Sequence, residues 1–351
     1  MSNSTKSFFR QANDASELLI ASVRRFQFTV VALGFLVLPI SPISAVNAEP
    51  NHLQAKVRSA IERSIPYLEE KGMEWIRDKK CVSCHRVGNM VWSLTEARSI
   101  GFKTSEKLDD WIEWSLTASL KKNEKGEVVG LGNKEGVAQL ILGLDDLAAK
   151  KRRDLLDLLK QEQEPNGSWK PGGQLPTQKR LPGETREAST MWIALALQNH
   201  APSAFEKALH HLDEPLGKST EWIALKLLIA RQTKNSLSRK RFARLLIEKQ
   251  NKDGGWGWLT SEQSDALGTG IALYALRLAD SDSESNLTSM LKAQEFLLSN
   301  QKKDGSWDVR STKGKKREFI EETSSYWGTA WAILGLIKGL ENPDRQSSQK
   351  N

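Results

Sequence analysis

Two kinds of helical segment alternate along residues 57–340. Amphipathic stretches, with apolar residues every three or four positions, occupy 152–162, 240–249 and 291–300. After a polar loop, each is followed by a segment that is apolar nearly all round and rich in small residues, such as Thr190-Met-Trp-Ile-Ala-Leu. A helix that is apolar on every side is buried on every side. The pattern therefore predicts helix pairs in which the first helix faces solvent and the second is enclosed.

Six such pairs fit into the chain, with almost no strand signal between them. They run approximately over 57–101, 104–148, 150–199, 203–231, 236–279 and 289–340. Because the second helices are the more apolar, we predict an all-α fold of two concentric rings with these helices inside. An open superhelix of stacked pairs is the alternative.

A short motif, Gln-x3-Gly-x-Trp, recurs at the turn inside the later pairs. Its copies begin at Gln163, Gln250 and Gln301 and end at Trp169, Trp256 and Trp307. Similarity at fixed spacing is the signature of a repeat protein. The second helices also align, each on a threonine: Thr190, Thr220, Thr269 and Thr329.

These turns and the second helices that align on a threonine resemble the terpenoid cyclase and protein prenyltransferase superfamily, especially the squalene–hopene cyclase repeats. The resemblance covers about 57–340 and is strongest from residue 150 onwards. It implies an α/α toroid, and six pairs suit one closed α6/α6 barrel. It also implies that the Gln and Trp of each turn are structural, with the Gln tying neighbouring helices together. A buried indole brings much apolar area and a single N–H to satisfy.

The cyclase chemistry of that family is not expected here. Squalene–hopene cyclases start the reaction with an aspartate in an Asp-x-Asp-Asp-Thr-Ala motif, and alignment on Thr190 puts Ala188 at the position of that proton donor. Asp265, four residues before Thr269, stands alone. The zinc ligands of the prenyltransferases and the thioester sequence of complement-type toroids are absent. We therefore predict a scaffold, and class II cyclase activity is not expected.

Carboxylates at the loop ends of the second helices allow a different enzyme. A glycan-cleaving toroid would need two of them roughly 5–10 Å apart. The alternative, which we favour, is that they are helix N-terminal charges that complement the helix dipole. The candidates are Glu187, Glu221, Glu321 and Glu322.

The first pair carries a different motif, Cys81-Val82-Ser83-Cys84-His85, about where later pairs have their Gly-x-Trp turn. This spacing is typical of covalent c-type haem attachment. Cys81 and Cys84, the two cysteines of the chain, would form the thioether bonds, and His85 would be the proximal iron ligand. Trp75 and Trp92 are candidates to pack against the haem, although each also fits the core of its helix.

Other interpretations of the motif stay open. Cys81 and Cys84 would form a disulfide in an oxidising compartment, or a redox pair with lowered thiol pKa. Together with His85 and one further ligand they would bind zinc. The sixth haem ligand is equally open, and a five-coordinate iron fits as well. The candidate ligands are Met73, His52, Met191, His200, His210 and His211.

Residues 1–48 have the features of a secretory signal. Arg24 and Arg25 precede the apolar run 26–40, and small residues, Val46 and Ala48, stand before the expected cut. The run is shorter than the roughly 20 residues of a membrane span. We predict a cleaved signal, with an uncleaved anchor as the alternative, and a periplasmic or other exported location. The predicted division is 1–48 signal or anchor, 49–102 first hairpin with CxxCH, 103–341 remaining repeats and 342–351 a disordered tail.

The formal net charge of the chain is +8. Its Lys and Arg residues are scattered, apart from short basic runs at 150–153 and 313–317. Nucleic-acid binding needs a basic stripe with a reading element, so we expect none, although some affinity for anionic membrane surfaces fits. The sequence therefore predicts an exported c-type monohaem protein that transfers electrons or senses a redox partner protein. An isoprenoid or other lipid in the ring is implied only by the resemblance. The alternatives are a non-haem toroid that binds lipid or protein, and a divergent cyclase-like enzyme.

Overall fold

The computed structural model describes residues 48–80, 86–144, 149–172, 180, 182–212, 217–279, 284–313 and 318–340. They all belong to the unit that spans Ala45–Asn351. Within these residues the chain forms twelve α-helices and a short 3-10 helix, Gly130–Asn133, with only isolated β-bridges. The predicted all-α fold is confirmed.

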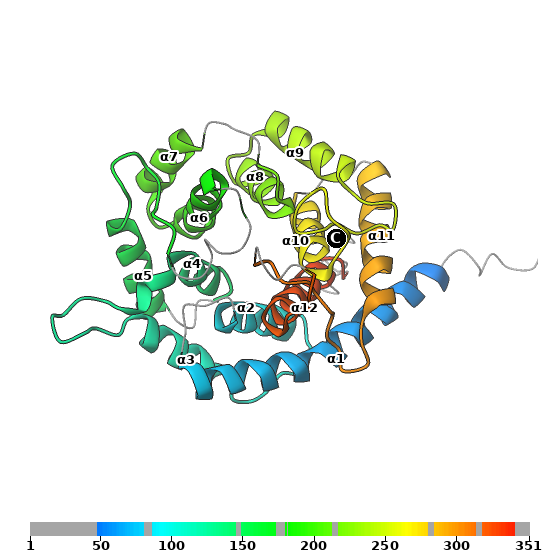
Figure 1. Ribbon diagram of the computed structural model, residues 1–351, viewed down its shortest axis with the longest axis horizontal. Helices are drawn as coiled ribbons and strands as arrows, with labels where there is room; N and C mark the ends of the chain where they lie inside the picture. Colours follow the sequence, from blue (N-terminus) through cyan, green and yellow to red (C-terminus); the bar gives the residue numbers. More distant parts are fainter. Residues whose placement is uncertain are drawn as a thin grey trace, which may run out of the picture. The chain divides into compact units, whose positions relative to one another are not determined.

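The twelve helices form two rings (Figure 1). The outer ring consists of α1 (Ala48–Lys79), α3 (Leu108–Ser119), α5 (Ala149–Gln161), α7 (Pro202–His211), α9 (Ser236–Glu248) and α11 (Glu284–Asn300). The inner ring consists of α2 (Val87–Ser99), α4 (Lys134–Leu142), α6 (Pro182–Leu197), α8 (Thr220–Gln232), α10 (Ala266–Leu278) and α12 (Glu322–Ile337). Each inner helix packs against the next, and α12 packs against α2 while α1 packs against α11 and α12. The ring is therefore closed, which excludes the open superhelix.

All six inner helices begin at the same end of the barrel, which we call the N-terminal rim. Side-chain caps mark these starts: Asn133 accepts a hydrogen bond from the Gly136 N–H (3.3 Å), and Ser219 accepts one from the Trp222 N–H (3.0 Å). Such caps satisfy backbone donors that have no partner inside the helix. The loops that enter the inner helices therefore meet at this rim.

The repeated turn ties three helices together, as its last copy shows. Gln301 Nε2 donates to the carbonyl oxygens of Ala60 on α1 (2.8 Å) and Gly305 in the turn (3.1 Å). Trp307 Nε1 donates to the Leu297 carbonyl on α11 (2.8 Å), and its backbone N–H donates to Thr329 Oγ1 on α12 (3.2 Å). The Gln therefore joins this pair to the next around the ring, and the Trp and the aligned Thr join the two helices of the pair. The other copies make the same bonds through Gln163, Trp169 and Thr190 and through Gln250, Trp256 and Thr269.

A fourth copy of this turn, which the sequence did not reveal, lies in the second pair. Lys122, Gly126 and Val128 stand at the positions of its Gln, Gly and Trp. The Gly126 N–H donates to the Asn123 carbonyl (3.0 Å), and the Asn123 N–H donates to the Glu127 carbonyl (2.9 Å). The turns at 163–169, 250–256 and 301–307 close with the same two backbone bonds, and each has a glycine with φ between 83° and 88° where Gly126 has 79°.

Four aromatic rings meet inside the barrel. Trp92, Trp192, Tyr274 and Trp331 come from α2, α6, α10 and α12, and their ring centroids lie 5.3–5.9 Å apart. Trp192 and Trp331 come from opposite inner helices, so the rings close the barrel axis at this level. Edge-to-face pairs of this kind add about 0.5–1.5 kcal/mol beyond their buried area.

Among the described residues no helix combines the length and the hydropathy that crossing a membrane requires.

Candidate functional site

The N-terminal rim holds a buried group of charged side chains, here called the Arg180 cluster, formed by Arg180, Glu135, Glu221, Ser189 and Trp192. Arg180 stands just before α6, and its side chain is fully buried. Its guanidinium donates to both oxygens of Glu135 on α4 (2.8 and 3.0 Å) and to both oxygens of Glu221 on α8 (2.7 and 2.8 Å). Ser189 Oγ donates to Glu135 (2.8 Å), and Trp192 Nε1 donates to Glu221 (2.9 Å).

Two carboxylates thus share one guanidinium away from water. Burial raises the pKa of Glu221 to about 7, against the opposing effects of Arg180 and of the Trp192 hydrogen bond. For Arg180, burial alone would lower the pKa, but Glu135 and Glu221 outweigh it and the pKa is raised. Arg180 therefore stays charged, and Glu221 takes up a proton near neutral pH.

This arrangement makes the stability of the protein depend on pH. Because the folded-state pKa of Glu221 is raised, the folded chain holds one more proton than the unfolded chain between about pH 4.5 and 7. The free energy of unfolding then falls as the pH rises through this window. We expect Glu221→Gln to reduce the loss of stability between pH 5 and 8 by on the order of 1–3 kcal/mol. Urea titrations at the two pH values measure it.

Part of the dependence should persist in that variant, since burial also raises the pKa of Asp265, to about 6. Glu113→Gln is the control. Glu113 is exposed, and a hydrogen bond from Lys151 lowers its pKa, so its titration lies below the window. An unchanged difference between pH 5 and 8 in Glu221→Gln would show that Glu221 is ionised throughout.

Other carboxylates of the rim are also held by donors. Glu184 accepts hydrogen bonds from the backbone N–H groups of Ser219 (2.9 Å) and Lys218 (3.1 Å). Glu187 accepts from Trp222 Nε1 at 2.5 Å. Glu221 and Glu187, predicted as helix N-terminal charges that complement the helix dipole, accept hydrogen bonds within the protein, and Glu221 is fully buried. These carboxylates accept hydrogen bonds that hold loops and indole side chains in place. This arrangement differs from an open pair of catalytic acids.

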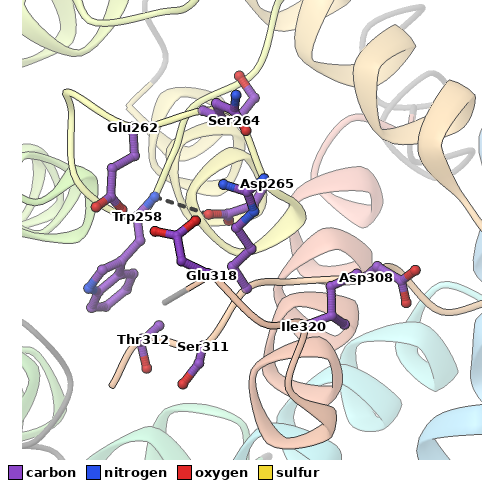
Figure 2. A pocket seen from close by; sticks show the side chains of 11 residues that line it. Trp258, Glu262, Ser264, Asp265, Asp308, Ser311, Thr312, Glu318 and Ile320 are labelled. Carbon is purple, nitrogen blue, oxygen red and sulfur yellow. Dashed lines mark hydrogen bonds between the residues drawn. The ribbon is translucent and has the colours of Figure 1, made fainter. Parts of the chain in front are cut away.

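A cavity of about 300 Å³ opens at the same rim, beside the start of α10 (Figure 2). It is lined by acidic and polar side chains, and by the ring of Trp258. Asp265 caps α10: it accepts from the Gly268 N–H (2.7 Å) and the Trp258 N–H (3.1 Å), the bond drawn in Figure 2. Asp265 is therefore a helix cap. Ala188, at the place of the cyclase proton donor, is fully buried on α6.

The predicted haem motif, Cys81 to His85, lies outside the described residues, but both of its flanks are described. Helix α1 ends at Lys79, Lys80 has φ 49°, and α2 begins at Val87. Along the chain the motif thus stands between the end of α1 and the start of α2, the first inner helix.

Arg86, the residue after the motif, is only 3% exposed. Its guanidinium lies over the rings of Trp75 (4.5 Å) and Tyr326 (5.2 Å), and Nη2 is 3.1 Å from Glu322 Oε1. Arg86 Nε and Trp75 Nε1 are buried and have no hydrogen-bond partner among the described residues. The start of α2 therefore has two buried donors, both next to the motif.

The other residues predicted to surround a haem are spread through the fold. Trp92 belongs to the aromatic cluster in the barrel, whereas Trp75 lies beside the motif. Met73 is on the last turns of α1, and His52, on the first turns, is about 30 Å from Met73 along that helix. Met191 is fully buried on α6, His200 bonds to Asp157 (2.8 Å), and His210 and His211 end α7. Of these candidate ligands, Met73 lies near the end of α1 that leads into the motif, whereas His52 lies near its start. No cluster of three His, Cys, Asp or Glu side chains suited to a metal ion occurs in the described part of the chain.

Comparison with known proteins identifies the architecture. No family model matches the chain. Over 109 residues, 31% of the chain, it is 34% identical to the terpene cyclase/mutase ntnI of a Nectria species. Over 106 residues, 29% of the chain, it is 34% identical to lanosterol synthase erg7A of Aspergillus fumigatus. These matches span 14% and 13% of the length of those curated proteins.

Solved structures agree with this architecture. The type II terpene cyclase MstE from Scytonema, in complex with its product merosterolic acid A, matches with a TM-score of 0.58 at 12% identity, over 82% of this chain and 98% of that one. An unsaturated glucuronyl hydrolase from Bacillus sp. GL1 matches with a TM-score of 0.53 at 13% identity, over 81% and 96%. The chain therefore has a terpene cyclase-like α/α toroid fold. At such identities these structures speak for the fold alone.

Proposed function

We propose that this protein is an exported c-type haem protein that uses a terpene cyclase-like toroid as its scaffold and exchanges electrons with a partner protein. The observation that carries the proposal is Cys81-Val82-Ser83-Cys84-His85, which contains both cysteines of the chain at the spacing of haem attachment. Bound haem supplies one-electron redox chemistry. Cys81 and Cys84 tether it, and His85 binds its iron.

The surroundings of the motif suit a haem, which carries two carboxylates. Lys79, in the last turn of α1, and Lys80, which follows it, are basic and exposed. Arg86 and Trp75 offer buried donors without partners among the described residues. A group that brings anionic acceptors to this point would satisfy them, because buried polar groups are normally hydrogen-bonded.

The barrel itself favours a scaffold role over cyclisation. Ala188 offers no acidic proton, and Glu221 and Asp265 are committed to Arg180 and to the start of α10. The aromatic cluster closes the axis where a cyclase would need room for a polyprenyl chain. Lipid binding follows only from the resemblance, and the proposal does not depend on it.

The test is to export the full chain from a host with c-type maturation machinery and to stain a denaturing gel for haem. We expect haem that survives denaturation and a reduced-minus-oxidised visible spectrum in the wild type. Cys84→Ala should lose both, and Ser83→Ala, which leaves the attaching residues unchanged, should keep them.

A folded but colourless wild type overturns the proposal. Thiol titration and zinc analysis of that sample then separate the alternatives. If neither cysteine titrates as a thiol and no zinc is present, the pair forms a Cys81–Cys84 disulfide. Stoichiometric zinc indicates a metal site.

A further inference from the structure

The side chain of Arg86 is unusual among the cations of the described residues. It is buried, lies over two aromatic rings and is paired with a carboxylate, yet its Nε–H has no partner there. Holding a guanidinium out of water is costly unless its donors are used. The pairing with Glu322 is through Nη2 (3.1 Å), and Glu322 itself is 63% exposed. The Nε–H of Arg86, which directly follows the haem motif, is therefore a donor without a partner among the described residues.

A second free donor lies next to it. The indole of Trp75 faces the Arg86 guanidinium at 4.5 Å, and its Nε1–H is also buried without a partner in the described part of the chain. Tyr326, whose ring centroid lies 5.2 Å from the guanidinium, donates its hydroxyl to the Leu68 carbonyl (3.0 Å). The two rings and Glu322 thus fix where the guanidinium lies.

We infer that Arg86 and Trp75 bind a carboxylate of the haem through these two N–H groups, with Arg86 as a positioning residue that sets the haem's charge environment. The inference rests on the proposed function. Arg86 directly follows His85, so a haem held by Cys81, Cys84 and His85 must lie within a few residues of it along the chain. A fork of charged donors is well suited to a carboxylate.

A cation beside a haem favours the reduced form, which carries one positive charge less than the oxidised form. We therefore expect Arg86→Met to lower the equilibrium constant for reduction against a fixed mediator by about tenfold, or ~59 mV for one electron. Trp75→Phe removes the N–H but keeps an aromatic side chain, although a smaller one, beside the Arg86 guanidinium, so its decrease should be smaller. Arg77→Met is the matched control, because Arg77 is exposed on the last turn of α1 and pairs with Asp78. It should stay close to the wild type.

The readout is the midpoint potential of the haem-loaded full chain, measured from the visible spectrum under mediated titration. A wild type without haem overturns the proposed function and this inference with it. A haem-loaded wild type whose potential is the same in Arg86→Met as in Arg77→Met overturns the inference alone. A purely structural role would lower stability in both the loaded chain and the haem-free Cys84→Ala chain, and would leave the potential unchanged.

Arg86→Lys keeps the experiment decisive if Arg86→Met fails to fold. The lysine keeps a positive charge beside the rings of Trp75 and Tyr326 and removes the Nε–H. Its potential should lie between that of the wild type and that of Trp75→Phe combined with Arg86→Lys. Equal potentials in the wild type, Arg86→Lys and the double variant would contradict the hydrogen bonds that we infer.

Discussion

Arg180→Met is expected to lower the free energy of unfolding by about 3–5 kcal/mol at pH 8, because it leaves two buried carboxylates without their cation. Glu135 and Glu221 lie on different inner helices, and the guanidinium of Arg180 joins them at the N-terminal rim. Urea unfolding followed by tryptophan fluorescence measures the change. At pH 5 the deficit should shrink, because burial raises the pKa of Glu221 to about 7 and its protonated carboxyl group needs no cation.

The matched control is Arg186→Met. Arg186 pairs with Glu164 on a half-exposed part of the same rim, and such pairs contribute about 0–1 kcal/mol. A charge-free cluster, with Arg180→Met combined with Glu135→Gln and Glu221→Gln, should recover much of the stability. Equal losses in Arg180→Met and in the triple variant would mean that packing, and not charge, is what Arg180 supplies.

Gly305→Ala is expected to cost about 2–4 kcal/mol, from a backbone conformation unsuited to Ala and a severe clash. Gly305 has φ 83°, and a Cβ at this position would lie 2.0 Å from the Arg63 carbonyl oxygen on α1. Because that neighbour is backbone, α1 and the last turn would have to separate. Thermal unfolding of the purified chain measures the loss.

Two other glycines separate the causes. Gly101 has φ 89°, and a Cβ added to it would have no atom within 4 Å, so Gly101→Ala should show the conformational cost alone, about 1–2 kcal/mol. Gly183 is exposed on α6 with free space around it, and Gly183→Ala should be neutral or raise stability by up to about 1 kcal/mol. If Gly305→Ala cost no more than Gly101→Ala, contact across the seam between the last and first pairs would be looser than described.

The repeat pattern was enough to predict the helix pairs and which helix of each pair is buried, because the features that determine them are local. Each Gln-x3-Gly-x-Trp turn lies within seven residues, and the burial of the second helices follows from their composition. The copy at Lys122 could not be predicted from the sequence, because its backbone hydrogen bonds form without the Gln and the Trp. Val128 and Lys122 carry no signal, and only the glycine with positive φ marks the turn.

The Arg180 cluster could not be predicted in the same way. Arg180 meets Glu221 and Glu135 across 41 and 45 residues of sequence, and each looks like an ordinary solvated charge in its own segment. The aromatic cluster is similar, since Trp92 and Trp331 fit the core pattern of their helices and nothing local shows that they touch. Contacts that depend on how distant helices are placed require the three-dimensional structure.

Closure of the ring also shapes how the chain reaches its folded state. Within the ring, Gln163 and Gln250 bond to partners 41 and 39 residues away, but Gln301 reaches back 241 residues to Ala60. The entropy lost in closing the longer loop is greater by about 1–2 kcal/mol, and contacts between remote segments form slowly. Helix α1 packs against α11 and α12, the last two helices of the toroid along the chain, so the seam forms only after both have been synthesised. Until then the inner helices present apolar surface at both ends of an open arc, and this interval is when the chain is most exposed to aggregation and to chaperones.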